Sequence, residues 1–338
     1  MFTNDQLHHF KDKVDTAQTV AIFGHHWVDG DAVWAMLGLG KILEKLEKKV
    51  SYFTSVAPSS SFAFVQHIEK IQATFDYGVY DLIIFVDFTG YNRISWITKG
   101  HEDYFNNANL IVIDHHIDDD FMQISPTAVI YKEVDASSCC EIILEMCESL
   151  RPDLIDAEIA THWYMGLVTD TGGFQFEKDS VKTFSHAITL VKYWADKAWL
   201  IQKLFNSTPH SLLDFMKLVT PRIQFSWHIC SVRYTLEELA WLGLSQEQAE
   251  SVMIFIRSIY GIAVYAELRV STEHIKISLR SWYTDTGRLD VQKIALTLGG
   301  GWHMYAAWCA KLRDPQLPIE QQISTIIDHL NTEAQKQL

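Results

Sequence analysis

The chain has 338 residues, of which 48% are hydrophobic and 21% are charged, so it has enough apolar material for a core and suits two domains better than one. Its formal net charge of −14 argues against a protein that grips long nucleic acid, because such proteins usually present a basic surface to the phosphates. The acidity favours a small anionic substrate, bound by metal ions and a few Arg or Lys side chains.

No stretch reaches the roughly 18 consecutive apolar residues of a membrane span, and residues 1–15 lack the basic patch and apolar core of a signal peptide. We therefore expect no membrane association. The five cysteines form no CxxC pair, which argues against both a disulfide framework and a zinc ribbon. The expected location is the cytoplasm, with reduced thiols.

The first 200 residues alternate short apolar runs with amphipathic stretches, which is typical of an α/β sheet with helices on its faces. Strands are predicted at 19–23, 50–54, 81–86, 110–113 and 127–131, and helices at 31–49, 137–150 and from about 156 towards 168. Ser138, three residues before Glu141, is a capping-box signature at the start of the second helix.

After residue 205 the pattern changes. We predict a linker helix over 206–222, then a strand near 228–235, a helix over 245–259 and strands at 261–270 and 274–281. The expected fold class is therefore α/β with two domains. Residues 1–205 would form a Rossmann-like, mostly parallel sheet flanked by helices and residues 223–338 a smaller α/β domain, with the active site in the cleft between them.

Acidic residues and histidines follow the predicted strands. His25, Asp29 and Asp31 come after the first strand, Asp87 after the third, Asp114, His115 and His116 after the fourth, and Thr169, Asp170 and Thr171 after the segment WYMGLV. Ligands of open α/β sheets bind beyond the carboxyl ends of the strands. We therefore expect four strand ends to bring these groups to one edge of the sheet.

Each of these residues also has a structural interpretation. Asp29 or Asp31 could cap the helix that begins near residue 31, and Asp87 could be a turn residue. So many aspartates, with no Lys or Arg in the same segments, would repel one another unless cations neutralised them. Mixed carboxylate and imidazole ligands suit Mn²⁺, Mg²⁺ or Fe²⁺ better than a thiolate-type zinc site. Together they predict a divalent-metal site.

These motifs resemble the DHH phosphoesterase superfamily. The resemblance rests on H-x3-D-x-D at 25–31, the lone Asp87, D-H-H at 114–116 and T-D-T-G at 169–172. SLRS at 278–281 and GGGWHMYAAW at 299–308 resemble the DHH-associated C-terminal domain, so the similarity covers nearly the whole chain. DASSCCEII and IATHWYMGLVTDTGGFQF make the order of motifs most similar to the bacterial oligoribonuclease and phosphoadenosine-phosphate phosphatase branch.

The resemblance implies two divalent metal ions, usually manganese, with magnesium as the alternative. His25 and Asp29 would bind one ion, and Asp31, His115 and Asp170 would bind the other. Asp87 would bridge the two ions and so take part in catalysis. His116 would face the substrate phosphate, and Asp114 would orient the neighbouring imidazoles through a hydrogen bond.

The resemblance also implies a substrate site in the second domain. Its residues would be Arg280, Ser281, Gly299, Gly300, Gly301, Trp302 and His303. Arg280 and His303 match the positions that hold the phosphate end of the substrate, and the glycines would let the backbone approach it closely. Trp302 stands where the family has a glycine, and it would narrow the pocket or stack on a base. Trp308 also replaces a glycine and is expected to pack into a local core.

The predicted function is a metal-dependent phosphoesterase that hydrolyses very short oligonucleotides, or phosphorylated nucleotides such as 3′-phosphoadenosine 5′-phosphate. Three alternatives remain open: hydrolysis of pyrophosphate or short polyphosphate, a cyclic- or linear-dinucleotide phosphodiesterase, and a nucleotide-sensing module that has lost catalysis. A sensor would predict missing ligands, and none of the predicted ligands is missing. Long duplex nucleic acid is not an expected partner, and a homodimer is compatible with the sequence.

Overall fold

The computed structural model describes residues 2–26, 28–58, 62–88, 90, 93–116, 124–125, 127–175, 178–207, 209–227, 229–259, 261–282 and 287–337, without the side chains of Glu247, Trp302 and His303. The chain divides into two compact units, unit 1 at Met1–Ser207 and unit 2 at Thr208–Leu338. The predicted linker helix exists as α9 (His210–Val219), and its buried face belongs to the core of unit 2. Among the described residues, no helix combines the length and apolarity that crossing a membrane requires.

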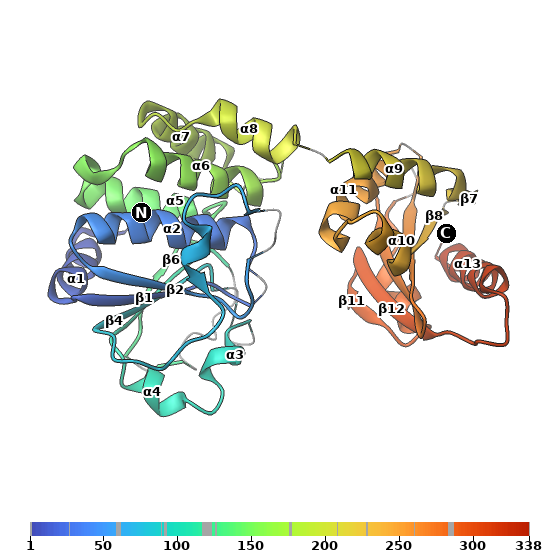
Figure 1. Cartoon of the computed structure of the whole chain (residues 1–338), viewed down its shortest axis with the longest axis horizontal. Helices are drawn as coiled ribbons and strands as arrows, with labels where there is room; N and C mark the ends of the chain where they lie inside the picture. Colours follow the sequence, from blue (N-terminus) through green and yellow to red (C-terminus); the bar gives the residue numbers. More distant parts are fainter. Residues whose placement is uncertain are drawn as a thin grey trace. The chain divides into compact units, whose positions relative to one another are not determined.

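Unit 1 is built on a six-stranded parallel sheet (Figure 1). The strands are β1 (Thr19–Phe23), β2 (Lys49–Phe53), β3 (Ile71–Gln72), β4 (Leu82–Val86), β5 (Leu110–Asp114) and β6 (Val129–Lys132). Their order in space is β3-β2-β1-β4-β5-β6. The order therefore reverses between β1 and β4, and such a switch point is where doubly wound sheets bind ligands beyond their strand ends.

Helices cover both faces of this sheet. They are α1 (Asn4–Thr16), α2 (Gly30–Lys45), α3 (Ser95–Thr98), α4 (Glu102–Asn106), α5 (Cys139–Leu150), α6 (Ala157–Asp170), α7 (Ser180–Lys192) and α8 (Lys197–Phe205). Figure 1 shows α5 to α8 on the same side of the sheet as α2, with α3 and α4 on the other side. Side chains alternate between these faces, so that Ile22 and Ile84 join the core under α2 while Phe23 and Phe85 join the opposite core.

The helix predicted from about residue 156 is present as α6, but one of the four expected strand ends is therefore a helix end. The segment WYMGLV lies inside helix α6, so Asp170 is the last residue of a helix and does not follow a strand. Nearly every residue from Ile159 to Val168 is buried, because α6 packs against α2 and α5 and is itself covered by α7 and α8. A helix buried all round has no polar face, and its sequence then reads like a buried strand.

Unit 2 contains a second six-stranded sheet, in the order β11-β12-β10-β9-β8-β7. Its strands are β7 (Gln224–Ser226), β8 (Ile229–Thr235), β9 (Val264–Val270), β10 (His274–Ser281), β11 (Gly301–His303) and β12 (Ala306–Leu312). Neighbouring strands are antiparallel except for β8 and β9, which are parallel. The predicted α/β fold class, with a parallel sheet between helices and a second, smaller unit, is confirmed.

The helices of unit 2 separate into two groups. Besides α9, they are α10 (Leu236–Trp241), α11 (Gln246–Arg257), α12 (Val291–Leu296) and α13 (Ile319–Gln335). One core joins α12 and α13 to one face of the sheet, and a second core joins α9, α10 and α11 to β8 and part of β9 on the other face.

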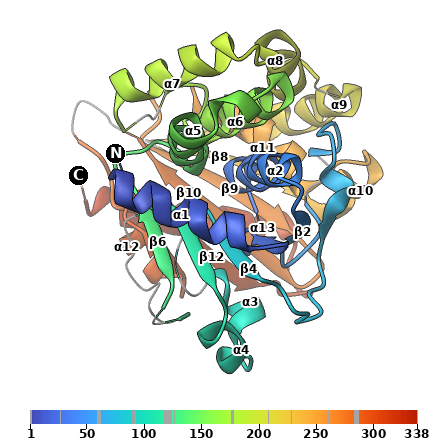
Figure 2. The ribbon, with the colours of Figure 1, turned by 90° about the vertical axis from the view of Figure 1, so that its left-hand side faces the viewer.

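Figure 2 shows the long helix α1 of unit 1 crossing in front of the strands of its own sheet.

Candidate metal centre

The structure brings the predicted ligands together at the carboxyl ends of β1, β4 and β5 and at the adjoining ends of α2 and α6. Three groups of residues each place one possible ligand atom per residue within 4.8 Å of the others: His25 with Asp29 and Asp87, Asp31 with His115 and Asp170, and Asp87 with His115 and His116. The groups overlap at Asp87 and His115. Their donors therefore form one continuous centre.

Asp29 fills both roles that its sequence position allows. One oxygen caps helix α2, because Oδ1 accepts the backbone N–H of Ala32 at 3.2 Å. The other oxygen, Oδ2, lies 3.5 Å from Nε2 of His25. The cap fixes the carboxylate with its second oxygen directed at the centre.

Asp87 lies at the middle of the centre and is only 1% exposed. Its Oδ2 is 3.5 Å from Nε2 of His25, and its Oδ1 is 3.4 Å from Nε2 of His115. Its backbone has a φ of 54°, a left-handed conformation that non-glycine residues adopt at a cost and often at functional sites. Asp87 therefore directs one oxygen to each side of the centre.

Asp31 is held at the amino end of helix α5. Its two oxygens accept the backbone N–H groups of Cys139 and Cys140, and the carboxylate is 1% exposed. Gly166 on α6 leaves room for the carboxylate of Asp31, because a Cβ at Gly166 would lie 2.6 Å from Oδ1 of Asp31 and 2.3 Å from Sγ of Cys140. The sequence indicated the start of α5 through Ser138, but it gave no signal that this start would anchor Asp31.

The two most buried imidazoles are oriented in the same way. Nδ1 of His25 is 2.9 Å from the carbonyl of His26, and Nδ1 of His115 is 3.3 Å from the carbonyl of Ala136. Nη2 of Arg93 also lies 3.1 Å from Nδ1 of His25, and Nζ of Lys178 lies 3.4 Å from Nδ1 of His115. Both Nδ1 atoms are thus held from outside the centre, and both Nε2 atoms face carboxylates. This is the arrangement of histidines that bind a metal through Nε2.

Asp114 supports the next histidine of the triplet. Its Oδ1 accepts the backbone N–H of Phe88 at 3.1 Å and lies 2.9 Å from Nδ1 of His116. His116 is 35% exposed, whereas His115 is 5% exposed. Asp114 therefore fixes His116 by one ring nitrogen and leaves the ring partly open to solvent.

Lys178 was not predicted and contacts the same triplet. Its Nζ donates to the backbone carbonyl of His115 at 2.9 Å, and its backbone N–H donates to Oγ of Ser137 at 2.8 Å. No sequence signal points to this residue, because it lies 63 positions after His115 in a segment without a motif.

The centre is electrostatically strained without bound cations. Burial, and then the charge of Asp87, raises the pKa of Asp31 well above its usual value, and burial raises the pKa of Asp170 to about 6. For His25 and His115, burial alone would lower the pKa, but the surrounding carboxylates outweigh it and raise the pKa to about 10 and about 9. Protons thus take up the negative charge that the aspartates place here.

No Lys or Arg of the described residues forms an ion pair with Asp29, Asp31, Asp87 or Asp170; within the described part of the chain, these carboxylates pair with histidines. Nε2 of His25 and Oδ1 of Asp87 are buried and have no hydrogen-bond partner. Buried lone pairs that receive no hydrogen bond suit a cation. These acidic and histidine groups are placed for metal binding.

The predicted substrate residues of unit 2 lie on β10 and around β11. Arg280 is half-buried on β10, and its Nη1 donates to the carbonyl of Leu279 at 3.0 Å. Ser281, the next residue, is 1% exposed and lies on the opposite side of the strand. The side chains of Trp302 and His303 lie outside the described part of the structure.

The three glycines precede or begin β11. Gly299 has a φ of 76°, which favours glycine. A Cβ on Gly300 would lie 2.1 Å from the carbonyl oxygen of Trp308, so no side chain fits there. Gly301 pairs with Trp308 in the sheet. The loop can therefore lie against β12 only because these positions lack side chains.

Residues 19–167 match the family described as DHH family, N-terminal domain. The matched segment contains His25, Asp29, Asp31, Asp87 and the D-H-H triplet, and Asp170 lies three residues beyond it. This segment is a DHH-family domain.

Several relatives that cover most of the chain share one name. The bifunctional oligoribonuclease and PAP phosphatase NrnA of Thermus thermophilus is 28% identical over 286 residues, which cover 82% of this chain and 80% of that protein. The protein of the same name from Bacillus subtilis is 24% identical over 270 residues, covering 78% and 81%. The DHH-family domain and these relatives identify the chain as a phosphoesterase hydrolase.

A solved structure shares the fold. The exopolyphosphatase-related protein from Bacteroides fragilis has a TM-score of 0.80, with 98% of this chain and 96% of that chain covered. The identity is 22%. At this identity the likeness speaks for the architecture alone.

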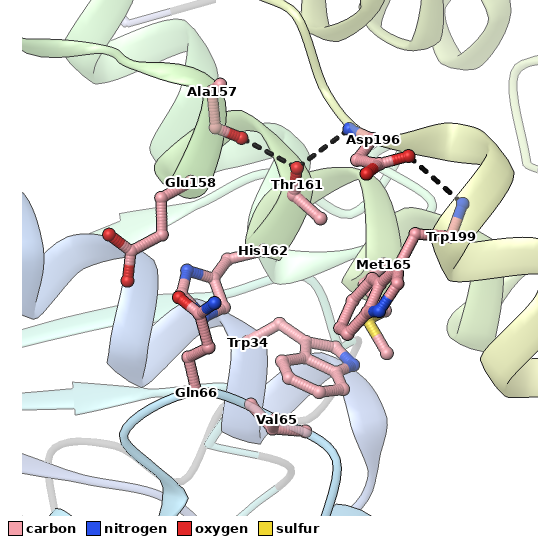
Figure 3. A pocket seen from close by; sticks show the side chains of 10 residues that line it. All are labelled: Trp34, Val65, Gln66, Ala157, Glu158, Thr161, His162, Met165, Asp196 and Trp199. Atoms are coloured by element: carbon pink, nitrogen blue, oxygen red, sulfur yellow. Dashed lines mark hydrogen bonds between the residues drawn. The ribbon is translucent and has the colours of Figure 1, made fainter.

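The DHH-family unit also contains a cavity of about 270 Å³ away from the metal centre (Figure 3). Its lining residues are Trp34, Val65, Gln66, Ala157, Glu158, Thr161, His162, Met165, Asp196 and Trp199. None of them belongs to the three ligand groups. Burial lowers the pKa of His162 to about 4, so its ring is neutral at physiological pH, and it stacks on Trp34. The cavity is lined in part by aromatic side chains and is distinct from the predicted metal site.

Proposed function

We propose that this phosphoesterase hydrolyses short oligonucleotides and phosphorylated nucleotides, such as 3′-phosphoadenosine 5′-phosphate, at two divalent metal ions. His25 and Asp29 would hold one ion, and Asp31, His115 and Asp170 would hold the other. Asp87 would bridge the two ions, with manganese as the preferred metal and magnesium as the alternative. Unit 1 would be the catalytic domain and unit 2 the substrate-binding domain.

The observation that carries the proposal is the position of Asp87. Its two oxygens face different histidines, at 3.5 Å from Nε2 of His25 and 3.4 Å from Nε2 of His115. Each of these histidines belongs to a separate group of three possible ligands. A buried carboxylate shared between two such groups supports a bridging role.

Bound divalent ions would supply an activated water and neutralise charge on the phosphoryl oxygens. The chain's own residues would do the rest. Asp114 accepts from Nδ1 of His116, which leaves Nε2 of that ring to face the substrate. His116 would hold a proton at Nε2 for the leaving oxygen, and the charge of Asp114 would stabilise the protonated ring.

In unit 2, Arg280 would bind the phosphate end of the substrate through two parallel hydrogen bonds. Gly299, Gly300 and Gly301 would bring backbone N–H groups near it, together with His303 and Trp302. Ser281 is buried on the other side of β10, so it would position Arg280 and would not touch the phosphate.

The substrate class follows from the named relatives and is tested by a panel of compounds. Purified protein with Mn²⁺ would be offered a dinucleotide, 3′-phosphoadenosine 5′-phosphate, a cyclic dinucleotide, pyrophosphate and a 20-mer. We expect turnover of the first two and little of the 20-mer. Turnover of pyrophosphate alone would contradict the proposal, and turnover of the cyclic dinucleotide alone would make the protein a cyclic-dinucleotide phosphodiesterase.

Two aspartate variants test whether turnover depends on the metal centre, one at the centre and one as its control at the surface. Asp87→Ala should abolish turnover of every compound. Asp153→Ala removes an exposed carboxylate of the same unit, paired only with Arg151 at the surface, and should leave activity unchanged. No turnover of any compound by the folded wild-type protein would favour a nucleotide-sensing module.

A further inference from the structure

One face of the unit 2 sheet is only partly covered. On the side of α9, α10 and α11, the core contains residues of β8 and one residue of β9, and none from β10 or β12. The inward residues of β10 and β12, such as Ile277, Leu279 and Ala307, belong to the core on the opposite face. The other face of β10 and β12 therefore carries no apolar core over it.

Trp308 stands on this open face. It was expected to pack into a local core, but its side chain is 45% exposed, so that expectation is wrong. Strand alternation explains the difference, because Ala307 and Cys309 point into the core and Trp308 between them must point outward. Trp308 therefore belongs to neither of the buried cores of unit 2.

The strand neighbours of Trp308 leave its ring accessible. Directly opposite it stand Ser278 on β10 and Gly301 on β11. Neither residue is large enough to cover an indole. A Cβ on Gly301 would meet only Cδ2 of Leu296, at 3.8 Å, so no atom of the Trp308 ring lies within 4 Å of that position.

Basic side chains lie near the Trp308 indole on the β10 side. Nζ of Lys276 lies 5.2 Å from the centroid of the Trp308 ring. Arg280 is two positions along β10 from Ser278, which places it roughly 7 Å from the Trp308 pair and on the same face. Arg269, on β9, donates to Oγ of Ser278 at 2.9 Å.

The carboxylate of Glu267 on this face pairs with Arg269, whose Nε lies 3.5 Å from Oε1, and among the described residues it forms no ion pair with Lys276 or Arg280. Glu267 is 3% exposed and accepts a hydrogen bond from Oη of Tyr234 at 2.5 Å. The face is thus cationic and aromatic within a chain whose net charge is −14. A flat ring beside positive charges, about one nucleotide's length apart, is complementary to a base joined to a phosphate.

We propose that Trp308 is a base-stacking platform: the base of the nucleotide substrate stacks on its indole while Arg280 and Lys276 bind the adjoining phosphate. The inference rests on the proposed function, since it assigns a base-recognising residue to the same substrate. Trp308 thereby sets a preference for nucleotides over phosphate compounds that have no base.

The test compares two ligands that differ only in the base. Adenosine 5′-monophosphate and ribose 5-phosphate are titrated calorimetrically into the full chain in EDTA, so that metal binding and turnover play no part. We expect Trp308→Ala to weaken adenosine monophosphate binding about tenfold or more and to leave ribose 5-phosphate within twofold of the wild type. Trp308→Phe keeps an aromatic face and should restore most of the affinity.

Trp241→Ala is the matched control, because Trp241 is an 84% exposed indole on α10 of the same unit, and it should change neither affinity. Equal binding of adenosine monophosphate by wild type and Trp308→Ala, or no millimolar binding by the wild type, would overturn the inference. So would a changed sedimentation coefficient in Trp308→Ala with unchanged nucleotide affinity, which would assign the indole to self-association.

The two proposals fail separately. If the wild type hydrolyses a dinucleotide with Mn²⁺ and Trp308→Ala leaves KM and kcat unchanged, the stacking role is wrong and the proposed function stands. If the wild type hydrolyses no nucleotide but binds adenosine monophosphate through Trp308, the proposed function is wrong and the base site stands.

Discussion

Unit 1 contains two clusters of carboxylates and histidines. They differ in whether Lys or Arg side chains also balance the negative charge. The metal centre gathers Asp29, Asp31, Asp87 and Asp170 around histidines. The α5–α7 cluster, formed by Glu141, Glu145, Lys182 and His186, pairs each carboxylate with a cation: Lys182 and His186 lie 3.0 and 3.1 Å from Glu145, and His186 lies 3.5 Å from Glu141.

The pKa values follow this difference. In the α5–α7 cluster, burial alone would raise the pKa of Glu145, but His186 and Lys182 outweigh it and lower the pKa to about 2. In the metal centre, the pKa of Asp170 rises to about 6. The number of acids therefore does not mark a metal site. The lack of matching Lys or Arg side chains does, because those acids need a cation from outside the chain.

The largest effect should come from Asp87→Asn. The amide keeps the size of the side chain but removes the charge that would face both ions. We expect kcat with a dinucleotide to fall by at least about a thousandfold, more than the roughly 10–100-fold typical of residues that only support a ligand. Steady-state kinetics with Mn²⁺ checks this. Activity within tenfold of the wild type would remove Asp87 from the bridging position.

Asp114→Asn tests a supporting residue of the same centre. The charge behind His116 is lost, while the ligands remain. We expect kcat to fall by about 10–100-fold and the manganese content to stay at the wild-type level. Kinetics and elemental analysis of the same preparation check both parts. A loss of manganese equal to that of Asp87→Asn would show that Asp114 is a ligand.

Opposite stability changes should separate the two clusters. Glu145→Gln breaks a paired, buried carboxylate and should lower the free energy of unfolding by about 2 kcal/mol. Asp170→Asn removes a carboxylate whose charged form is disfavoured by burial and by its place at a helix C-terminus, so in EDTA it should raise that free energy by about 1 kcal/mol. Urea denaturation of both variants gives the signs. If both variants changed the free energy of unfolding in the same direction, the two clusters would not differ in how their carboxylates are compensated by positive charge.

The smallest effect is a pH dependence of the α5–α7 cluster. Burial alone would lower the pKa of His186, but Glu141 and Glu145 outweigh it and raise the pKa to about 9. A raised histidine pKa stabilises the folded state fully below the unfolded value of about 6.5, and this contribution is lost as the pH rises through about 9.

Wild type and His186→Gln should therefore differ in stability by on the order of 1 kcal/mol at pH 6, and the difference should shrink towards pH 10. Urea midpoints across this range measure it. A difference that grows with pH would show that His186 is buried in its neutral form.

The sequence predicts which side chains the structure brings together at the candidate metal centre, because that signal is local. Each apolar strand is followed directly by polar residues, as at His25 and Asp87, and parallel strands end at one edge. Asp170 was expected to follow a strand, and it arrives from helix α6 instead. The error does not move it from the centre, because α2 and α6 pack closely and their ends meet there.

Features that depend on packing between distant residues could not be predicted. The pairing of Glu141 with His186 joins residues 45 positions apart in two helices, and no sequence pattern links the two. Helices α7 and α8, which cover α6, were not predicted. The exposure of Trp308 depends on which face of β12 is covered, and a strand's sequence alone does not decide that.

The central claim is that the uncompensated aspartates hold two divalent ions. Calorimetric titration of Mn²⁺ into EDTA-treated, desalted wild-type protein tests it most directly, with Asp87→Asn titrated in parallel. We predict two equivalents of Mn²⁺ bound per chain by the wild type, and weakened binding at both sites in the variant. No binding by the wild type at millimolar Mn²⁺, or dinucleotide hydrolysis that persists in EDTA, would contradict it.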